Sequence, residues 1–212
     1  MVTQKIIINI FSNWVNMLIS IVISFLVSPI MVNQLGNEAY GIWVLAISLV
    51  NYFTVLDFGV NTAVVRYISK YFSAKDFLKA QQIYSSAFAF FTLIGIASIL
   101  AFAVFSFYFP DIFSIKIFSK DYLYFVFFLV GINLALNLIY SVFLGALTGL
   151  QHFVEINLIA ISTNIGKNII LVCLLLNDYS LLSIAILQLL TSLVKFFFQY
   201  SFLKKKLPFT DF

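Results

Sequence analysis

The stretch IIINIFSNWVNMLISIVISFLVSPIMV, residues 6–32, contains no Asp, Glu, Lys or Arg. A transmembrane helix needs about 20 consecutive, mostly apolar residues, so this run is long enough to cross a bilayer. It is too long for the apolar core of a secretory signal peptide, and no small-x-small cleavage site follows it. The sequence therefore predicts that this run is the first membrane span.

The composition extends this prediction to the rest of the 212 residues. Hydrophobic residues make up 63% of the chain and charged residues 9%, with a mean hydropathy of +1.08. Soluble domains carry about 45–50% apolar and about 25% charged residues, so this chain lacks the charged surface that keeps a domain in solution. We expect an all-α polytopic bundle, because open strands leave backbone groups unpaired in lipid and no alternating pattern indicates a barrel.

Apolar runs predict about six spans in a single transmembrane lobe, residues 1–212. Short polar turns separate the runs, as at residues 33–38, and no connector is long enough for a soluble domain. The 26 Phe residues are interpreted as lipid-facing. The expected spans are residues 8–32, 40–60, 82–109, 121–147, 156–176 and 180–203.

Lys and Arg predict how the spans are oriented, because cytoplasmic loops carry an excess of these residues. With the N-terminus inside, only Lys116 and Lys120 fall on the outer side, and Lys167 and Lys195 fall within spans. We therefore expect both termini to be cytoplasmic. The cations expected on the inner side are Lys5, Arg66, Lys70, Lys75, Lys79, Lys204, Lys205 and Lys206.

The long inner connector, residues 61–82, has apolar residues at helical spacing among basic ones. It is interpreted as a helix at the headgroup level with its basic side towards anionic lipid. It serves either as a topology anchor or in substrate entry.

Several classes of protein are excluded. The net charge of +4 comes from cations in short segments between apolar runs, so no basic face is available for nucleic acid. With one Cys and one His, no zinc-binding spacing exists. No nucleophile elbow, phosphate-binding loop or paired intramembrane carboxylate occurs. We expect no nucleic-acid partner, no metal, no cofactor and no enzymatic activity.

Four of the expected spans carry polar residues every three or four positions, which places them on one helix face. Such stripes can hold helices together, or they can line a shared hydrated cavity. Four amide-rich stripes favour the cavity. The stripes are Asn9, Asn13, Asn16, Ser20 and Ser24; Asn133, Asn137, Ser141, Gly145 and Thr148; Asn157, Asn164 and Asn168; and Gln188, Ser192, Lys195 and Gln199.

Lys167 is the most informative single residue. It lies about 16 Å from the inner end of its span at 1.5 Å per residue. An ammonium facing lipid at that depth costs at least about 2.5–3.5 kcal/mol, so Lys167 must face a cavity, pair with an acid or be neutral. Lys195 lies nearer the inner end, and its side chain could extend partly to the headgroups.

Asp57 lies near the inner end of the second expected span, two residues before Gly59. It is either an interfacial carboxylate or a functional group. As a functional group it would bind a proton or cation, or pair with Arg66 or Lys167. His152, in the short turn before the fifth span, is interpreted as a headgroup-level residue.

Three stretches resemble a known family. They are QLGNEAYGIW at residues 34–43, LDFGV with VVRYI at 56–60 and 64–68, and LTGLQH at 147–152 followed by Asn157. Together they are similar to the N-terminal part of polysaccharide flippases, the O-antigen and capsule-type transporters of the multidrug/oligosaccharidyl-lipid/polysaccharide exporter superfamily. The resemblance covers nearly the whole chain, in order.

This resemblance implies a transporter in the bacterial inner membrane that moves undecaprenyl-pyrophosphate-linked oligosaccharide to the outer leaflet for surface polysaccharide, such as the O-antigen of lipopolysaccharide. Lys167, Lys195 and Arg66 would then attract the pyrophosphate, and Asp57 would couple the cycle to a proton or sodium ion. The partners would be membrane lipid and the lipid-linked oligosaccharide. The amides implied in binding sugar hydroxyls are Asn13, Asn16, Asn137, Asn164 and Asn168.

The resemblance is to one lobe of a transporter with two six-span lobes. We therefore expect a truncated or partial N-terminal half, completed by a C-terminal lobe or a second copy. Two other functions are open: a drug/cation antiporter of the same superfamily, and a membrane scaffold for envelope glycosyltransferases that transports nothing. Lys167 argues against the antiporter, because a cavity for cations should carry acids.

Overall fold

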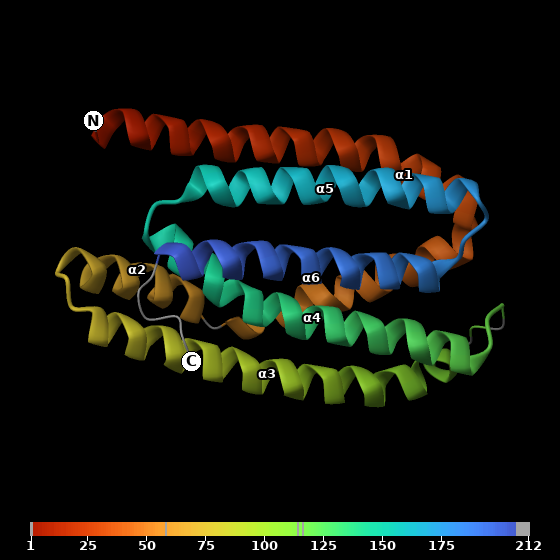
Figure 1. The fold of residues 1–212 in the computed structure, drawn as a ribbon. Helices are drawn as coiled ribbons and strands as arrows, with labels where there is room; N and C mark the ends of the chain where they lie inside the picture. Colours follow the sequence, from red (N-terminus) through yellow and green to blue (C-terminus); the bar gives the residue numbers. More distant parts are fainter. Residues whose placement is uncertain (1, 58, 114, 116, 207–212) are drawn as a thin grey trace.

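The computed structural model describes residues 2–57, 59–113, 115 and 117–206, and the regular structure in these ranges is entirely helical (Figure 1). This confirms the predicted all-α polytopic bundle. The helices run roughly side by side along the long dimension of the molecule (Figure 1). They are α1 (Val2–Thr54), the 3-10 helix η1 (Val55–Asp57), α2 (Val60–Ser73), α3 (Phe77–Ile112), α4 (Lys120–Gly149), α5 (Phe153–Leu176) and α6 (Leu181–Lys206).

Five of these helices are long and apolar enough to cross a membrane. The first, α1, contains the first expected span and most of the second, and its helical geometry is interrupted between them at Gly36 (φ 77°, ψ 164°). A residue with a side chain rarely adopts such a positive φ, and glycine does so without steric cost. The chain turns back there, so residues 37–54, here called the return segment, run antiparallel to the first part of α1 (Figure 1).

The second expected span is broken near its end. The return segment passes into η1, and α2 starts after Gly59, whose φ is again positive at 75°. In Figure 1, α2 continues towards the same end of the bundle as the return segment. The structure thus contains a helix in the long connector, with Val64 and Ile68 buried, while α3 begins at Phe77, before the expected third span.

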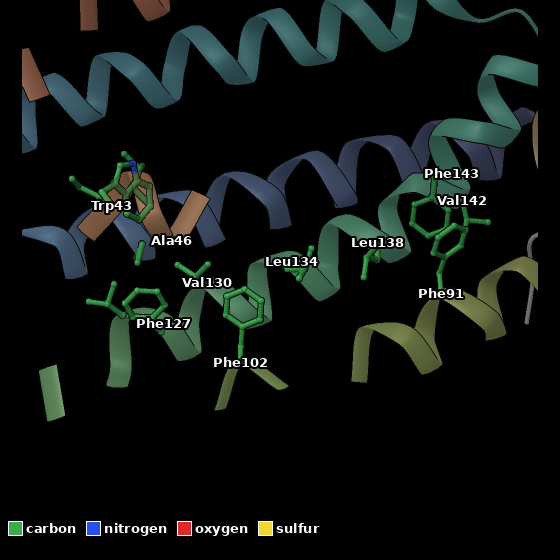
Figure 2. Close-up of a cluster of buried hydrophobic side chains, with 14 of the residues drawn as sticks. Trp43, Ala46, Phe91, Phe102, Phe127, Val130, Leu134, Leu138, Val142 and Phe143 are labelled. Carbon is green, nitrogen blue, oxygen red and sulfur yellow. The ribbon is translucent and has the colours of Figure 1, made fainter. Parts of the chain in front are cut away.

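Helix α4 is central, packing against α2, α3 and α6. Figure 2 shows its buried residues meeting Phe91 and Phe102 of α3 and Trp43 of the return segment. The rings of Phe109 and Phe127 lie 4.0 Å apart between centroids. The interpretation of the phenylalanines as lipid-facing is therefore wrong for these residues, which fill the gaps between helices. In lipid such packing, rather than the exclusion of water, holds helices together.

Helix α2 is held closely on α4. A Cβ atom added to Gly145 would lie 2.6 Å from Asn61 Oδ1, and one added to Gly149 would lie 2.8 Å from the carbonyl oxygen of Val65. Gly149 thus lets the two backbones approach, and Gly145 makes room for the Asn61 side chain. The Asn61 amide also donates to the carbonyl of Ser141 on α4, at 3.1 Å.

Candidate functional site

A cavity of about 420 Å³ lies between the return segment, α4 and α6. We call it the amide cavity, because most of its polar lining consists of Asn and Gln side chains. Trp43, Phe91 and Leu134 contribute apolar surface to it. A few polar groups on a mostly apolar wall are typical of a ligand site. The polar lining residues are Asn51, Asp57, Asn61, Asn133, Asn137, Ser141 and Gln188.

A second cavity of about 340 Å³ lies between the two parts of α1, α5 and α6. We call it the lysine cavity, because Lys167 lines it together with its neighbour Asn168. The hydroxyl groups of Ser28 and Tyr40, 3.2 Å apart, join the first part of α1 to the return segment at its wall.

The two cavities adjoin each other. Trp43, Ile47 and Gln188 line both of them. Trp43 and Ile47 belong to the return segment, so this helix stands between the two spaces. Trp43, Ile47 and Asn51 are spaced four residues apart and share one helix face.

Lys167 is half-buried on α5, and among the described residues no carboxylate lies within ion-pair distance of it. Of the open sequence alternatives, the structure thus favours the one that places Lys167 at a cavity. Lys195, half-buried on α6, does not line the two cavities. Charged residues inside membrane bundles usually face the interior or a water-filled space. Lys167 therefore supplies a positive charge at the lysine cavity.

Asp57 lies in the wall of the amide cavity, not the lysine cavity. Its Oδ1 accepts a hydrogen bond from the backbone N–H of Asn61 at 3.0 Å, which satisfies a free donor in the first turn of α2. In the described part of the chain Asp57 forms no ion pair, so neither expected pairing, with Arg66 or with Lys167, is present.

Arg66 lies outside both cavities. It is exposed on α2, with its guanidinium carbon 5.9 Å from the centroid of the Tyr67 ring. This position does not bring it to Lys167 or Lys195.

The amides of Asn13 and Asn16 lie at a seam between α1 and α5. The amide nitrogen of Asn16 donates to Asn157 Oδ1 at 3.0 Å, and that of Asn157 donates to Asn13 Oδ1 at 2.6 Å and to Ser12 Oγ at 2.9 Å. Farther along, Asn164 Nδ2 donates to Ser20 Oγ at 3.3 Å. These contacts hold the two helices together, so this part of the polar stripes has the structural role.

Asn137 and Asn168 do reach cavities. Asn137 is exposed in the amide cavity, and its Nδ2 donates to the Asn133 carbonyl at 2.7 Å. Ser192 of α6 donates to Asn133 Oδ1 at 2.5 Å. Asn168 donates to the carbonyl of Asn164 at 2.8 Å. The hydrogen bond between Ser192 and Asn133 therefore links α6 to α4 beside the amide cavity.

The sequence reasoning placed Gln188 in a polar stripe but did not single out Trp43 and Asn51 as site residues. The four-residue spacing of Trp43, Ile47 and Asn51 was the available signal, but it looks the same as an ordinary buried face. No group of three or more His, Cys, Asp and Glu residues that could hold a metal ion occurs in the described part of the chain.

One comparison with known proteins identifies a family. The sequence profile of a family described as polysaccharide biosynthesis protein matches residues 2–212. Neither the curated proteins nor the solved structures contain a match. Five long apolar helices and this match indicate a multi-pass membrane protein with a transport role in polysaccharide synthesis. The chain belongs to the polysaccharide biosynthesis protein family.

Proposed function

We propose that this chain forms a lobe of a flippase that moves undecaprenyl-pyrophosphate-linked oligosaccharide across the bacterial inner membrane. The observation that carries the proposal is Lys167, a membrane-embedded lysine without an ion pair among the described residues, at a cavity that adjoins a second one lined by amides. An uncompensated charge inside a bundle is costly, and an anionic ligand at the cavity would offset this cost.

The lysine cavity suits the pyrophosphate. Ammonium groups form short, charge-assisted hydrogen bonds with phosphate oxygens, and Lys167 of α5 presents one to this cavity. The ammonium of Lys167 at this cavity disfavours a cationic substrate, which opposes the drug/cation antiporter. A phosphate beside Lys167 would offset its charge.

The amide cavity suits the sugars. Asn and Gln side chains offer both donors and acceptors, as sugar hydroxyls require, and Trp43 adds an apolar surface. Asn137 and Gln188 are the residues we assign to hydroxyl contacts. Asn13, Asn16 and Asn164 bond between α1 and α5 and are assigned to the seam instead.

Asp57 is the residue that we assign to ion coupling. It is a carboxylate at a cavity, with no ion-pair partner in the described ranges. A proton or sodium ion bound there would change the charge beside the first turn of α2, which its oxygen now caps.

Both termini are assigned to the cytoplasm, because α1 begins and α6 ends at the same end of the bundle (Figure 1), where the basic α2 also lies. We propose that a second six-span lobe, or a second copy of this chain, forms the opposite wall of the cavities. Lipid and the lipid-linked oligosaccharide are the remaining partners.

Replacement of Lys167 by Ala tests this function. In a strain that lacks its own flippase and carries the gene in its natural length, Lys167→Ala should reduce surface polysaccharide about tenfold or more, since bonds to charged groups contribute about 1.5–3 kcal/mol. The control is Lys120→Ala, which removes an exposed lysine paired with Asp111 at 2.6 Å. A scaffold would leave surface polysaccharide unchanged in both variants at equal protein levels, and this result would reject the flippase.

A further inference from the structure

Two glycines in the left-handed region flank the return segment, Gly36 directly before it and Gly59 after the 3-10 helix η1 that follows it. Gly36 has φ 77° and Gly59 has φ 75°, and these are the positive-φ glycines of the described residues. A Cβ added to either would meet no heavy atom within 4 Å. Glycine at these positions is therefore explained by the positive φ of the backbone and not by a lack of space for a side chain.

The elements on both sides of the return segment are fastened to other helices. The first part of α1 is bonded to α5 through Asn16 and Asn157, at 3.0 Å. Helix α2 is fastened to α4 through Asn61 and the close approach at Gly145. A helix between two fixed elements, with a glycine break before it and another beyond η1, has the geometry of a segment that moves as a unit.

The position of the return segment gives such a motion a consequence. Its side chains Trp43 and Ile47 line both cavities, and Trp43 is only 5% exposed. Ile47, by contrast, is 38% exposed, because space lies beside this helix. A change in the tilt of the return segment would therefore move the wall that separates the lysine cavity from the amide cavity.

We infer that the return segment is a hinged partition. It pivots as one helix about Gly36 and Gly59, and in doing so it joins or separates the two cavities. Glycine crosses between positive and negative φ at little cost, so both ends can absorb the change. For transport the inference rests on the proposed function, since a head group with phosphate and sugars would need both cavities joined. The motion itself needs no substrate.

Distances between spin labels test the motion directly. The full chain, with Cys173→Ser to remove its one cysteine, would carry labels at Leu45 of the return segment and Leu190 of α6, both exposed. A second pair, at Leu158 of α5 and Leu190, reports on elements outside the partition. In lipid nanodiscs, pulsed electron paramagnetic resonance should give two distances for the first pair and one for the second.

The glycines are then replaced. Alanine is disfavoured at positive φ, so Gly36→Ala and Gly59→Ala should each reduce the conformer described here about five- to thirtyfold relative to the other. Asparagine tolerates the left-handed region, so the corresponding Asn variants should keep both distances. Gly41→Ala is the matched control, because Gly41 lies inside the return segment with a negative φ and open space around its Cβ.

The inference is overturned if the first pair shows one narrow distance in the parent protein. It is equally overturned if the alanine variants at Gly36 and Gly59 match Gly41→Ala. Should alanine prevent folding, the parent and asparagine measurements still decide. Because no substrate is added, two distances here together with normal polysaccharide in Lys167→Ala would reject the flippase and keep the hinge.

Discussion

The two halves of α5 carry similar polar residues and use them differently. In the N-terminal half, Asn157 is 5% exposed and bonds to Ser12, Asn13 and Asn16 of α1. In the C-terminal half, Lys167 and Asn168 line a cavity, and the ammonium has no ion pair among the described residues. Both halves carry polar residues, but those of the N-terminal half bond to α1, whereas those of the C-terminal half line a cavity.

This difference teaches that a polar stripe in a membrane helix is not itself a site. A stripe whose groups satisfy one another contributes to helix packing, whereas unsatisfied groups beside a cavity are available to a ligand. The two halves should therefore respond in opposite ways to substitution: stability should change at the seam, and activity at the cavity.

The largest expected effect is at Lys167. Lys167→Met keeps much of the side-chain length but removes the charge, which inside a membrane costs about 2.5–3.5 kcal/mol. Stability against unfolding in detergent should therefore rise by up to about that amount, while surface polysaccharide is lost. A loss of stability would mean that the ammonium has a structural partner, and the contrast between the halves of α5 would fail.

Asn157 should show the opposite behaviour. Asn157→Ala removes three hydrogen bonds across the seam. At about 0.6 kcal/mol for each such bond, unfolding should become easier by about 2 kcal/mol. The matched variant is Asn168→Ala. Among the described contacts the amide of Asn168 donates only within α5, so its loss should destabilise the protein much less. Equal losses in the two variants would remove the distinction between seam and cavity.

A smaller effect is expected at Asp57, where cap and charge can be separated. Asp57→Asn keeps an oxygen that can accept from the Asn61 N–H, whereas Asp57→Ala removes it and should destabilise the protein by about 1 kcal/mol. If the charge couples transport to an ion, both variants should lose the dependence of flipping on the ion gradient. Gradient dependence retained in Asp57→Asn would leave Asp57 with the cap alone.

The fold was predictable because a bilayer leaves few alternatives. Long apolar runs must become helices when no water is present to bond the backbone, and the polar turns mark where they end. The break at Val55–Asp57 was not predicted, since a hydropathy window of about 19 residues averages over so short an interruption. The break coincides with the positive φ of Gly59, which hydropathy does not report.

The site was predictable only in part. Helical spacing shows which residues share a face, but it does not show which helix that face meets, so Asn16 and Asn168 looked alike. Phe91 and Phe102 were misassigned for a related reason. Lipid and protein interior are both apolar, so hydropathy does not separate a ring that faces lipid from one packed between helices.

Protection of the lysine cavity by substrate tests the central claim most directly. In a Cys173→Ser background, Asn168→Cys places a thiol at this cavity and leaves Lys167 intact. A charged, membrane-impermeant thiol reagent should label it, and undecaprenyl-pyrophosphate-linked oligosaccharide should slow the labelling about tenfold or more, but not when Lys167 is also replaced by Met. A thiol that does not react, or labelling unaffected by the lipid-linked oligosaccharide, would contradict the account.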